Sequence, residues 1–218
     1  MPAKGTDAPS DDAIPSLPPT GWAVLGLLSF GEELSGYDLK RWADWSLRFF
    51  YWSPSFSQIY SELRRLESNG LAASRIETRD DVRGKRMYHI TDEGQRALAA
   101  WTATEHVDPV VLKHGVMLRL GLGHVSEPEH LRAILTEHRD QSERMRVRAE
   151  VDREGATVEP GWAYTELVLR WAERYYADER DRAELMLSEL DETTRLFQTS
   201  PAADSARRTA EELRQHRA

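Results

Sequence analysis

A capped helix followed by a basic hairpin is the feature that most constrains this chain. Ser55 and Gln58 have the spacing of a capping box, in which two side chains satisfy backbone amides at a helix start. The pattern predicts a helix over 55–69, ended by Gly70. Its apolar residues recur at helical spacing and are expected on one face, against the core: Phe56, Ile59, Leu63 and Leu66.

The segments around this helix complete a recognisable order. A two-stranded hairpin is expected over 71–91, because stretches rich in β-formers flank a turn at 80–84. Thr91 is placed to cap a helix over 92–103, and Ser35 to cap one over 36–51. A first helix is expected over 20–31, with Thr20 as its N-cap. Helix, helix, helix, hairpin, helix is the layout of a winged helix-turn-helix.

The rest of the chain divides by composition. Residues 1–19 hold five prolines and are expected to form a disordered arm. The winged helix-turn-helix is assigned to 20–104, a helical dimerisation domain to 105–198, and a polar tail to 199–218. Helices are predicted within the second domain at about 109–121, 127–153 and 161–197, the last with a break near 176–181. The predicted fold class is therefore mostly α with a small β-hairpin.

Charge and composition exclude several classes of protein. The sequence has no cysteine, which excludes disulfides and thiolate metal sites. It contains no apolar run long enough for a membrane span and no signal pattern, so a cytoplasmic protein with no membrane partner is expected. The net charge is −8. The predicted winged domain is neutral, with 11 basic and 11 acidic residues, so the acidity lies mainly after it.

The third helix and the hairpin supply the candidate DNA contacts. Opposite its apolar face, the helix presents Ser57, Gln58, Ser61, Arg64 and Arg65, with Tyr60 at the boundary. Arginine and glutamine bind purine edges, and small hydroxyl residues permit close approach to the groove. The hairpin carries cations that reach phosphates, together with a flexible glycine: Arg75, Arg79, Arg83, Gly84, Lys85 and Arg86. Either patch alone is more often a solvated surface; the two together in this order favour DNA binding.

Three segments of the sequence resemble the PadR family of regulators. They are Leu34-Ser35-Gly36-Tyr37-Asp38-Leu39, then Ser57 through Leu71, and Arg86 through Gly94. The resemblance covers about 20–102 and implies a homodimer whose third helices and wings bind a near-palindromic operator in double-stranded DNA. It also implies that Tyr37, Gln58, Tyr60 and Arg65 lie near DNA, and that a small molecule relieves repression.

Aromatic residues offer a candidate site for such an effector. Trp42, Trp45, Phe49 and Trp101 would suit a small aromatic or lipophilic molecule at the join of the two domains. The more ordinary interpretation is that these side chains form core and dimer interface, where aromatic residues are enriched.

Catalysis and metal binding have no support in the sequence. The seven histidines include no pair at metal-ligand spacing, so we expect no metal and no cofactor. No nucleotide-binding or nucleophile motif is found, and an enzyme is not expected. The alternative to a DNA-binding regulator is a winged-helix module that binds another protein. The neutral winged domain and the acidic second half favour that alternative.

Overall fold

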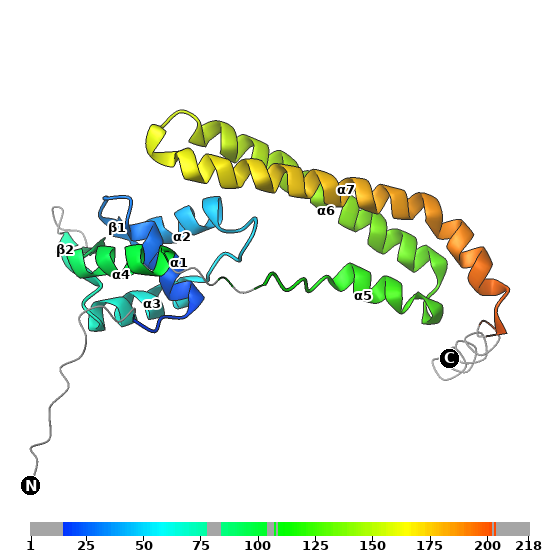
Figure 1. The fold of residues 1–218 in the computed structure, drawn as a ribbon, viewed down its shortest axis with the longest axis horizontal. Coiled ribbons are helices and arrows are strands. Elements are labelled where there is room, and N and C mark those ends of the chain that lie inside the picture. The colour runs from blue at the N-terminus through cyan, green and yellow to red at the C-terminus, as the bar shows by residue number, and fades with distance from the viewer. Residues whose placement is uncertain (1–14, 78–83, 104–106, 108, 202, 204–218) are drawn as a thin grey trace, which may run out of the picture. The chain divides into compact units, whose positions relative to one another are not determined.

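The computed structural model describes residues 15–77, 84–103, 107, 109–201 and 203 (Figure 1). The chain separates into two compact units, Met1–Asp108 and Pro109–Ala218, which are described separately here. The first unit contains α1 (Pro19–Leu28), β1 (Leu34–Ser35), α2 (Gly36–Ser46), α3 (Phe56–Ser68), β2 (Ala72–Glu77), β3 (Lys85–Ile90) and α4 (Asp92–Thr102). This is the winged helix-turn-helix order expected from the sequence.

The core of the first unit lies between α1, α2 and α3. Its largest fully buried side chains come from all three helices: Leu25, Leu28, Leu39, Ile59, Leu63 and Leu66. Burying a leucine or isoleucine contributes roughly 1.5–3 kcal/mol relative to leaving it in water. The apolar face of α3 therefore fixes the orientation of that helix, and its polar face is left outward.

Local capping fixes the ends of these helices as the sequence predicts. The Ser55 side chain accepts a hydrogen bond from the Gln58 amide, and the Gln58 side chain accepts one from the Ser55 amide. Ser35 and Asp38 form the same reciprocal box at α2. Gly70 adopts a φ of 70° after α3, a backbone conformation that glycine enters without steric cost.

The sheet has three antiparallel strands in the order β1-β3-β2. The hairpin pairs Ala72 with Ile90 at its base and Glu77 with Lys85 near its tip. The sequence did not predict β1, a two-residue strand in which Leu34 pairs with Tyr88. Its pairing adds a third strand to the edge of the wing.

The helix starts and ends differ from the prediction at two places. Helix α1 begins at Pro19, and its N-cap is Pro18 rather than the predicted Thr20. The helix starts earlier because proline suits the first turn of a helix. Leu17, which the prediction gave to the disordered arm, packs against the core. Helix α2 ends at Ser46 rather than at 51.

Two aromatic residues were placed wrongly by helical spacing. Phe56 is 45% exposed rather than in the core, because it lies in the first turn of α3 and stacks on Tyr37. Trp52 lies beyond the end of α2 and is exposed, whereas Phe49 is buried. The spacings of Trp42, Trp45, Phe49 and Trp52 predict one shared helix face, which is wrong for Phe49 and Trp52 because α2 ends before both of them.

The second unit is helical. It contains α5 (Gly115–Gly121), α6 (Pro128–Ala156) and α7 (Ala163–Gln198), with 3-10 turns at Gly123–Val125 and Pro160–Trp162. Helix α7 is continuous, so the predicted break near 176–181 is wrong. That stretch lacks proline and glycine, and the Arg182–Glu179 ion pair supports the helix there. The predicted helix at 109–121 begins only at Gly115, where the His114 side chain accepts a hydrogen bond from the Met117 amide.

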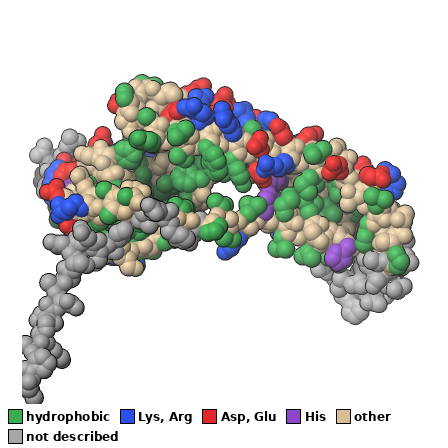
Figure 2. All heavy atoms as spheres, viewed as in Figure 1, with side chains coloured by type: hydrophobic (Ala, Val, Ile, Leu, Met, Phe, Trp, Pro, Cys, Tyr) green, Lys and Arg blue, Asp and Glu red, His purple; other side chains and the backbone are tan. Residues whose placement is uncertain are grey.

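Helices α6 and α7 pack against each other in antiparallel directions. Many of the buried residues between them are small, and this allows a close approach: Ser142, Ala149, Ala156, Ala172 and Ala183. Ion pairs join the two helices, among them Arg153–Glu173 and Arg180–Glu143, each at 2.8 Å. Figure 2 shows acidic and basic side chains interspersed along their surface. Within the described residues, no helix is long and apolar enough to cross a membrane.

The junction between α4 and the end of α3 requires glycine at position 94. A side-chain carbon at Gly94 would lie 2.0 Å from the Leu71 carbonyl oxygen, whereas one at Gly26 in α1 would meet nothing within 4 Å. We expect Gly94→Ala to lower the free energy of unfolding by about 1–3 kcal/mol, because the backbones must separate. Gly26→Ala, the control, should be neutral or stabilising by up to about 1 kcal/mol. Urea unfolding followed by tryptophan fluorescence measures both, and equal effects would contradict this packing.

Candidate nucleic-acid interface

Helix α3 presents a polar surface opposite its buried face. Ile59, Leu63 and Leu66 are fully buried. The predicted contact residues on the other side are all exposed: Ser57, Gln58, Ser61, Arg64 and Arg65. The Gln58 side chain also closes the capping box, accepting from the Ser55 amide at 2.8 Å. Its amide nitrogen is not used by that bond, so it keeps donors for a base edge.

The first turns of α2 and α3 meet through aromatic side chains. Tyr37 stacks on Phe56 with ring centroids 6.2 Å apart. A side-chain carbon at Gly36 would lie 2.5 Å from the Tyr60 ring, so the absence of a side chain there lets the ring lie against the backbone. Tyr37 is 61% exposed and Tyr60 is 41% exposed. Both hydroxyl-bearing rings thus lie beside the outer face of α3.

The hairpin places its described cations on the surface. Lys85 and Arg86 begin β3, next to Gly84, and all three are exposed. The Arg86 guanidinium lies 5.7 Å from the centroid of the Tyr88 ring and donates a hydrogen bond of 2.8 Å to Ser74. Arg79 and Arg83, which we also predicted as contacts, lie outside the described residues.

Carboxylates neutralise several of these cations. Lys85 pairs with Asp38 at 3.0 Å, Arg86 with Glu67 at 3.5 Å, and Arg65 with Glu62 at 3.5 Å. Arg75 pairs with Glu33, with Nε–Oε2 at 2.8 Å. Sequence reasoning missed these acidic partners, since most are far from their cations along the chain. The equal numbers of acidic and basic residues in this region thus include several pairs in close contact.

Asp38 has two roles at this surface. It accepts hydrogen bonds from Ser35, which cap α2, and from Lys85 in the hairpin. Partial burial opposes ionisation of this carboxyl, but the bonds from Ser35 and Lys85 outweigh it and hold its pKa below the ordinary value. The ionised group therefore joins the first residue of β3, near the tip of the wing, to the start of α2.

The aromatic residues predicted for an effector are divided between core and surface. Phe49 is buried, and Trp42 packs against the core with its ring edge toward Phe30. Trp101 stacks on Trp22, with centroids 5.0 Å apart. Trp45 is half-buried. The ordinary interpretation accounts for most of these contacts, and the effector site stays a prediction.

A side-chain cluster in the second unit was also missed. His114, His138 and Glu179 come together from three helices, although no two of them are close in sequence. Motif spacing gave no signal for it, because the cluster depends on how α5, α6 and α7 pack.

Comparison with known proteins connects this geometry to a family. Residues 24–100 match the "Transcriptional regulator PadR-like family". The negative transcriptional regulator PadR of Bacillus subtilis is 38% identical over 98 residues, which cover 45% of this chain and 53% of the relative. The matched stretch thus spans about half the length of that regulator.

Solved structures extend the likeness beyond the matched stretch. Bacillus subtilis PadR in complex with operator DNA has a TM-score of 0.68 at 26% identity, covering 78% of this chain and 98% of that one. The same regulator in complex with p-coumaric acid has a TM-score of 0.63 at 27% identity, with the same two coverages. These relatives are regulators rather than enzymes, in agreement with the expectation from the sequence.

The residues that match the family lie within the first unit, which has the winged helix-turn-helix order of elements. The chain therefore carries, over residues 24–100, a domain of the PadR-like family of transcriptional regulators.

Proposed function

We propose that this chain is a transcriptional regulator that binds operator DNA through α3 and the hairpin wing. The observation that carries the proposal is the division of α3 into a side where Ile59, Leu63 and Leu66 are fully buried and a side of exposed serine, glutamine and arginine residues beside a basic hairpin. The similar structure of Bacillus subtilis PadR with operator DNA supports the assignment.

Each part of this surface has a distinct role in DNA binding. Gln58, Arg64 and Arg65 reach base edges in the major groove, where bidentate contacts discriminate between bases. Ser57 and Ser61 permit close approach, and Tyr37 and Tyr60 contact the phosphate backbone. The wing contacts phosphates or the adjacent minor groove, with Gly84 at its tip and the following cations: Arg79, Arg83, Lys85 and Arg86.

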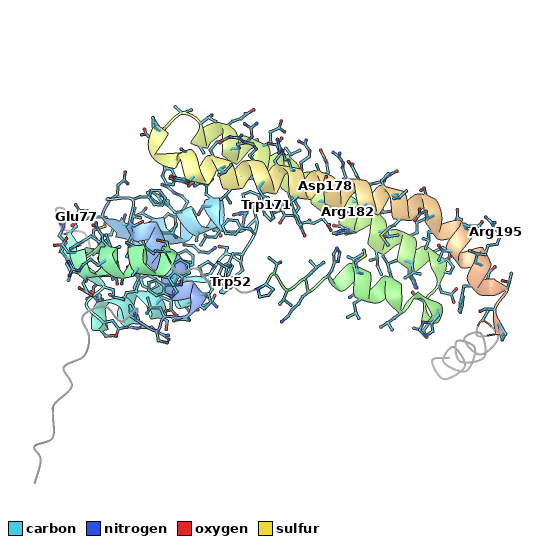
Figure 3. All side chains as sticks on the ribbon, in the orientation of Figure 1. Trp52, Glu77, Trp171, Asp178, Arg182 and Arg195 are labelled. Carbon is cyan, nitrogen blue, oxygen red and sulfur yellow. The ribbon has the colours of Figure 1, made fainter. Side chains whose placement is uncertain are left out.

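The regulator acts as a homodimer on a near-palindromic operator. Support comes from an exposed stripe along α7, in which Tyr164, Val168 and Trp171 recur at spacings of four and three (Trp171 is labelled in Figure 3). Trp171 is 50% exposed and stacks on Tyr175. Aromatic stripes of this kind are typical of helices that pack against a second copy.

Repression relieved by a small molecule is the mode of regulation that the relatives favour. One relative is named a negative regulator, and it is known in complex with p-coumaric acid. For this chain we propose a small aromatic or lipophilic effector bound near Trp42, Trp45, Phe49 and Trp101. An effector that prefers the DNA-incompetent arrangement shifts the population and releases the operator.

The competing function is a winged-helix module that binds a protein. The specific observation in its favour is the pairing of Lys85, Arg86 and Arg65 with carboxylates, which reduces the positive field of the surface. A DNA-binding measurement separates the two functions. Fluorescence anisotropy of a labelled duplex from the region upstream of the gene, against a scrambled duplex, should show sequence-dependent binding that weakens steeply with salt. Equal weak binding to both duplexes, by a folded chain, would favour the protein-binding module.

Arg65→Ala tests whether α3 reads bases. We expect specific binding to weaken by about 1–3 kcal/mol, with a smaller loss on scrambled DNA, because a base contact discriminates between sequences. Arg96→Ala on α4 is the control, since it removes the same charge from an exposed ion pair elsewhere in the first unit. Anisotropy titrations on both duplexes give the comparison. Equal losses for the two variants would argue against base reading by Arg65.

Glu67→Gln tests the neutralised wing. Glu67 pairs with Arg86 and accepts a hydrogen bond of 2.5 Å from Ser74. Removing this carboxylate frees Arg86 for phosphate, so affinity for both duplexes should rise by up to about fivefold, equivalent to ~1 kcal/mol for one exposed pair. Glu93→Gln on α4 gives the same change in net charge as a control. Identical effects of the two variants on anisotropy would mean that only the total charge matters.

Trp171→Glu tests the proposed dimer. A charge placed in an apolar interface leaves an unpaired ion there, so the variant should sediment as a monomer at concentrations where the native chain is a dimer. Val158→Glu, at an 83% exposed position in the turn before α7, makes a similar chemical change and should leave the dimer intact. Analytical ultracentrifugation gives the masses. A dimer that persists in Trp171→Glu would place the interface elsewhere.

A further inference from the structure

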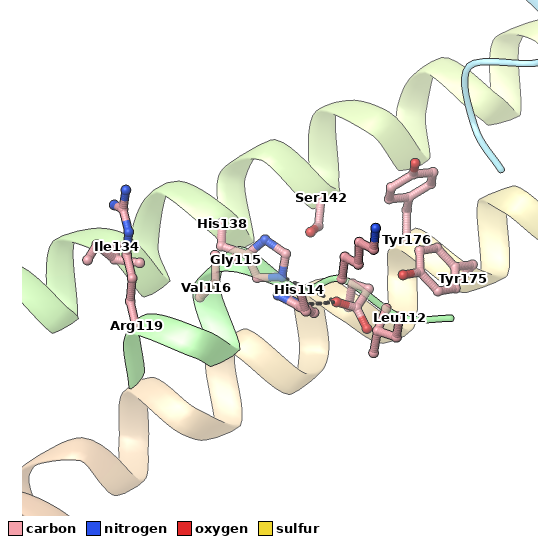
Figure 4. Close-up of a pocket in the computed structure, with 12 residues that line it drawn as sticks. Leu112, His114, Gly115, Val116, Arg119, Ile134, His138, Ser142, Tyr175 and Tyr176 are labelled. Atoms are coloured by element: carbon pink, nitrogen blue, oxygen red, sulfur yellow. Dashed lines mark hydrogen bonds and ion pairs between the residues drawn. The ribbon is translucent and has the colours of Figure 1, made fainter. Parts of the chain in front are cut away.

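Two histidines and a glutamate converge at one point within the second unit. His114 caps the start of α5, His138 lies on α6 and Glu179 lies on α7. Both imidazole Nε2 atoms approach the same carboxylate oxygen, His114 at 3.0 Å and His138 at 3.3 Å from Glu179 Oε2 (Figure 4). The three side chains are only 12–19% exposed. Their arrangement is therefore set by the packing of three helices rather than by solvent.

The spacing of these atoms matches the edges of a tetrahedral metal site. Zinc binds imidazole nitrogen and carboxylate oxygen at about 2.0–2.2 Å, so two ligand atoms at the tetrahedral angle lie about 3.3 Å apart. Two edges of the triangle measure 3.0 and 3.3 Å, and all three ligand atoms lie within 4.8 Å of one another. The third edge, between the two imidazoles, is therefore no longer than 4.8 Å.

The chemistry of the donors also suits a divalent ion. The Glu179 carboxylate accepts hydrogen bonds from His114, His138 and Arg182, so both of its oxygens have defined partners. Arg182 donates to Oε1 at 2.8 Å and thereby leaves Oε2 turned toward the histidines. A hydrogen bond of this kind holds a metal-binding carboxylate in one orientation.

We propose that His114, His138 and Glu179 bind a divalent transition-metal ion, with zinc as the best match to two imidazoles and one carboxylate. The inference concerns the second unit alone and stands whether or not the chain binds DNA. It departs from the sequence prediction, which found no metal-ligand spacing because the three ligands belong to three different helices.

Binding requires a change of tautomer at His114. Its Nδ1 accepts a hydrogen bond from the Met117 amide at 3.4 Å, so the ring proton of the neutral form lies on Nε2. A metal at Nε2 needs that proton on Nδ1, and the capping bond is then lost. At 3.4 Å this bond is long, so the exchange costs little compared with a metal–nitrogen bond.

His114, His138 and Glu179 line a pocket. The cavity beside the cluster has a volume of about 430 Å³ and is lined by Ser142, Tyr175 and Tyr176 among others. Arg119 also lines it, but its side chain points away from the histidine pair in Figure 4. Three protein ligands with an open fourth position leave room for water or an exchangeable ligand.

The ion would fasten α5 to the two long helices. Helix α5 has seven residues, and none of them is buried. One ligand from each helix would add a cross-link to the apolar cluster in which Val116 and Leu120 of α5 pack against Leu131, Leu135 and Leu190 of the two long helices. Binding to the folded form alone stabilises it in proportion to ligand concentration, so the ion should raise the melting temperature of the chain.

Cobalt(II) titration of the full chain tests the site, because its visible absorption reports coordination geometry. We expect one equivalent to give tetrahedral-type bands that zinc abolishes. Loss of a residue that only hydrogen-bonds a metal ligand typically weakens metal binding by about 10–100-fold. His138→Ala and Glu179→Gln each remove a ligand itself and should weaken cobalt binding by more than that. His130→Ala is the matched control, since His130 is exposed on the same helix. Cobalt absorption that does not saturate, or equal cobalt affinity of His138→Ala and the native chain, would overturn the proposal.

A second measurement needs no variant and so does not depend on whether the substituted chains fold. Zinc should protect His114 and His138 of the native chain from modification by diethyl pyrocarbonate, as read by peptide mass spectrometry. His124 and His130, both exposed, should react equally with and without zinc. Unchanged modification of His114 and His138 at saturating zinc would refute the assignment.

Discussion

The packing of one face of α3 determines what the first unit presents to its surroundings. Ile59, Leu63 and Leu66 are fully buried, and this burial fixes the rotation of the helix about its axis. The polar residues lie on the opposite side of the helix and therefore face outward: Ser57, Gln58, Ser61, Arg64 and Arg65. The capping box at Ser55 and the left-handed Gly70 fix where the helix begins and ends. The proposed reading surface is thus a direct consequence of core packing.

Electrostatics adds a second level of organisation to that surface. Lys85, Arg86 and Arg65 each lie within ion-pair distance of a carboxylate, so in the proposed complex the wing and α3 would meet DNA as paired charges. DNA phosphates would have to displace these carboxylates, and this would lower the affinity for non-specific DNA. Base contacts would then account for a larger part of the difference in affinity between operator and other DNA. Asp38 also has a structural role, because the same carboxylate pairs with Lys85 and caps α2.

Local signals predicted much of this structure, and tertiary contacts account for what was missed. The α3 cap, the Gly70 stop and the hairpin depend on neighbouring residues and were predicted correctly. Strand β1 was missed because two residues carry no pattern of their own and depend on pairing with β3. Phe56 follows the helical period but lies in the first turn, past the core. His114 and Glu179 are 65 positions apart, so only the packing of α5 and α7 brings them together.

The spacing of DNA contacts tests the proposed regulator most directly. Hydroxyl-radical footprinting of the native chain on the region upstream of its gene would map protected sugars on both strands. Two α3 helices in a symmetric dimer should protect two patches centred about 10–10.5 base pairs apart, or a multiple of that distance, on one side of the duplex. No protection at concentrations that saturate binding, or one unpaired patch, would contradict a dimer that reads two half-sites through α3.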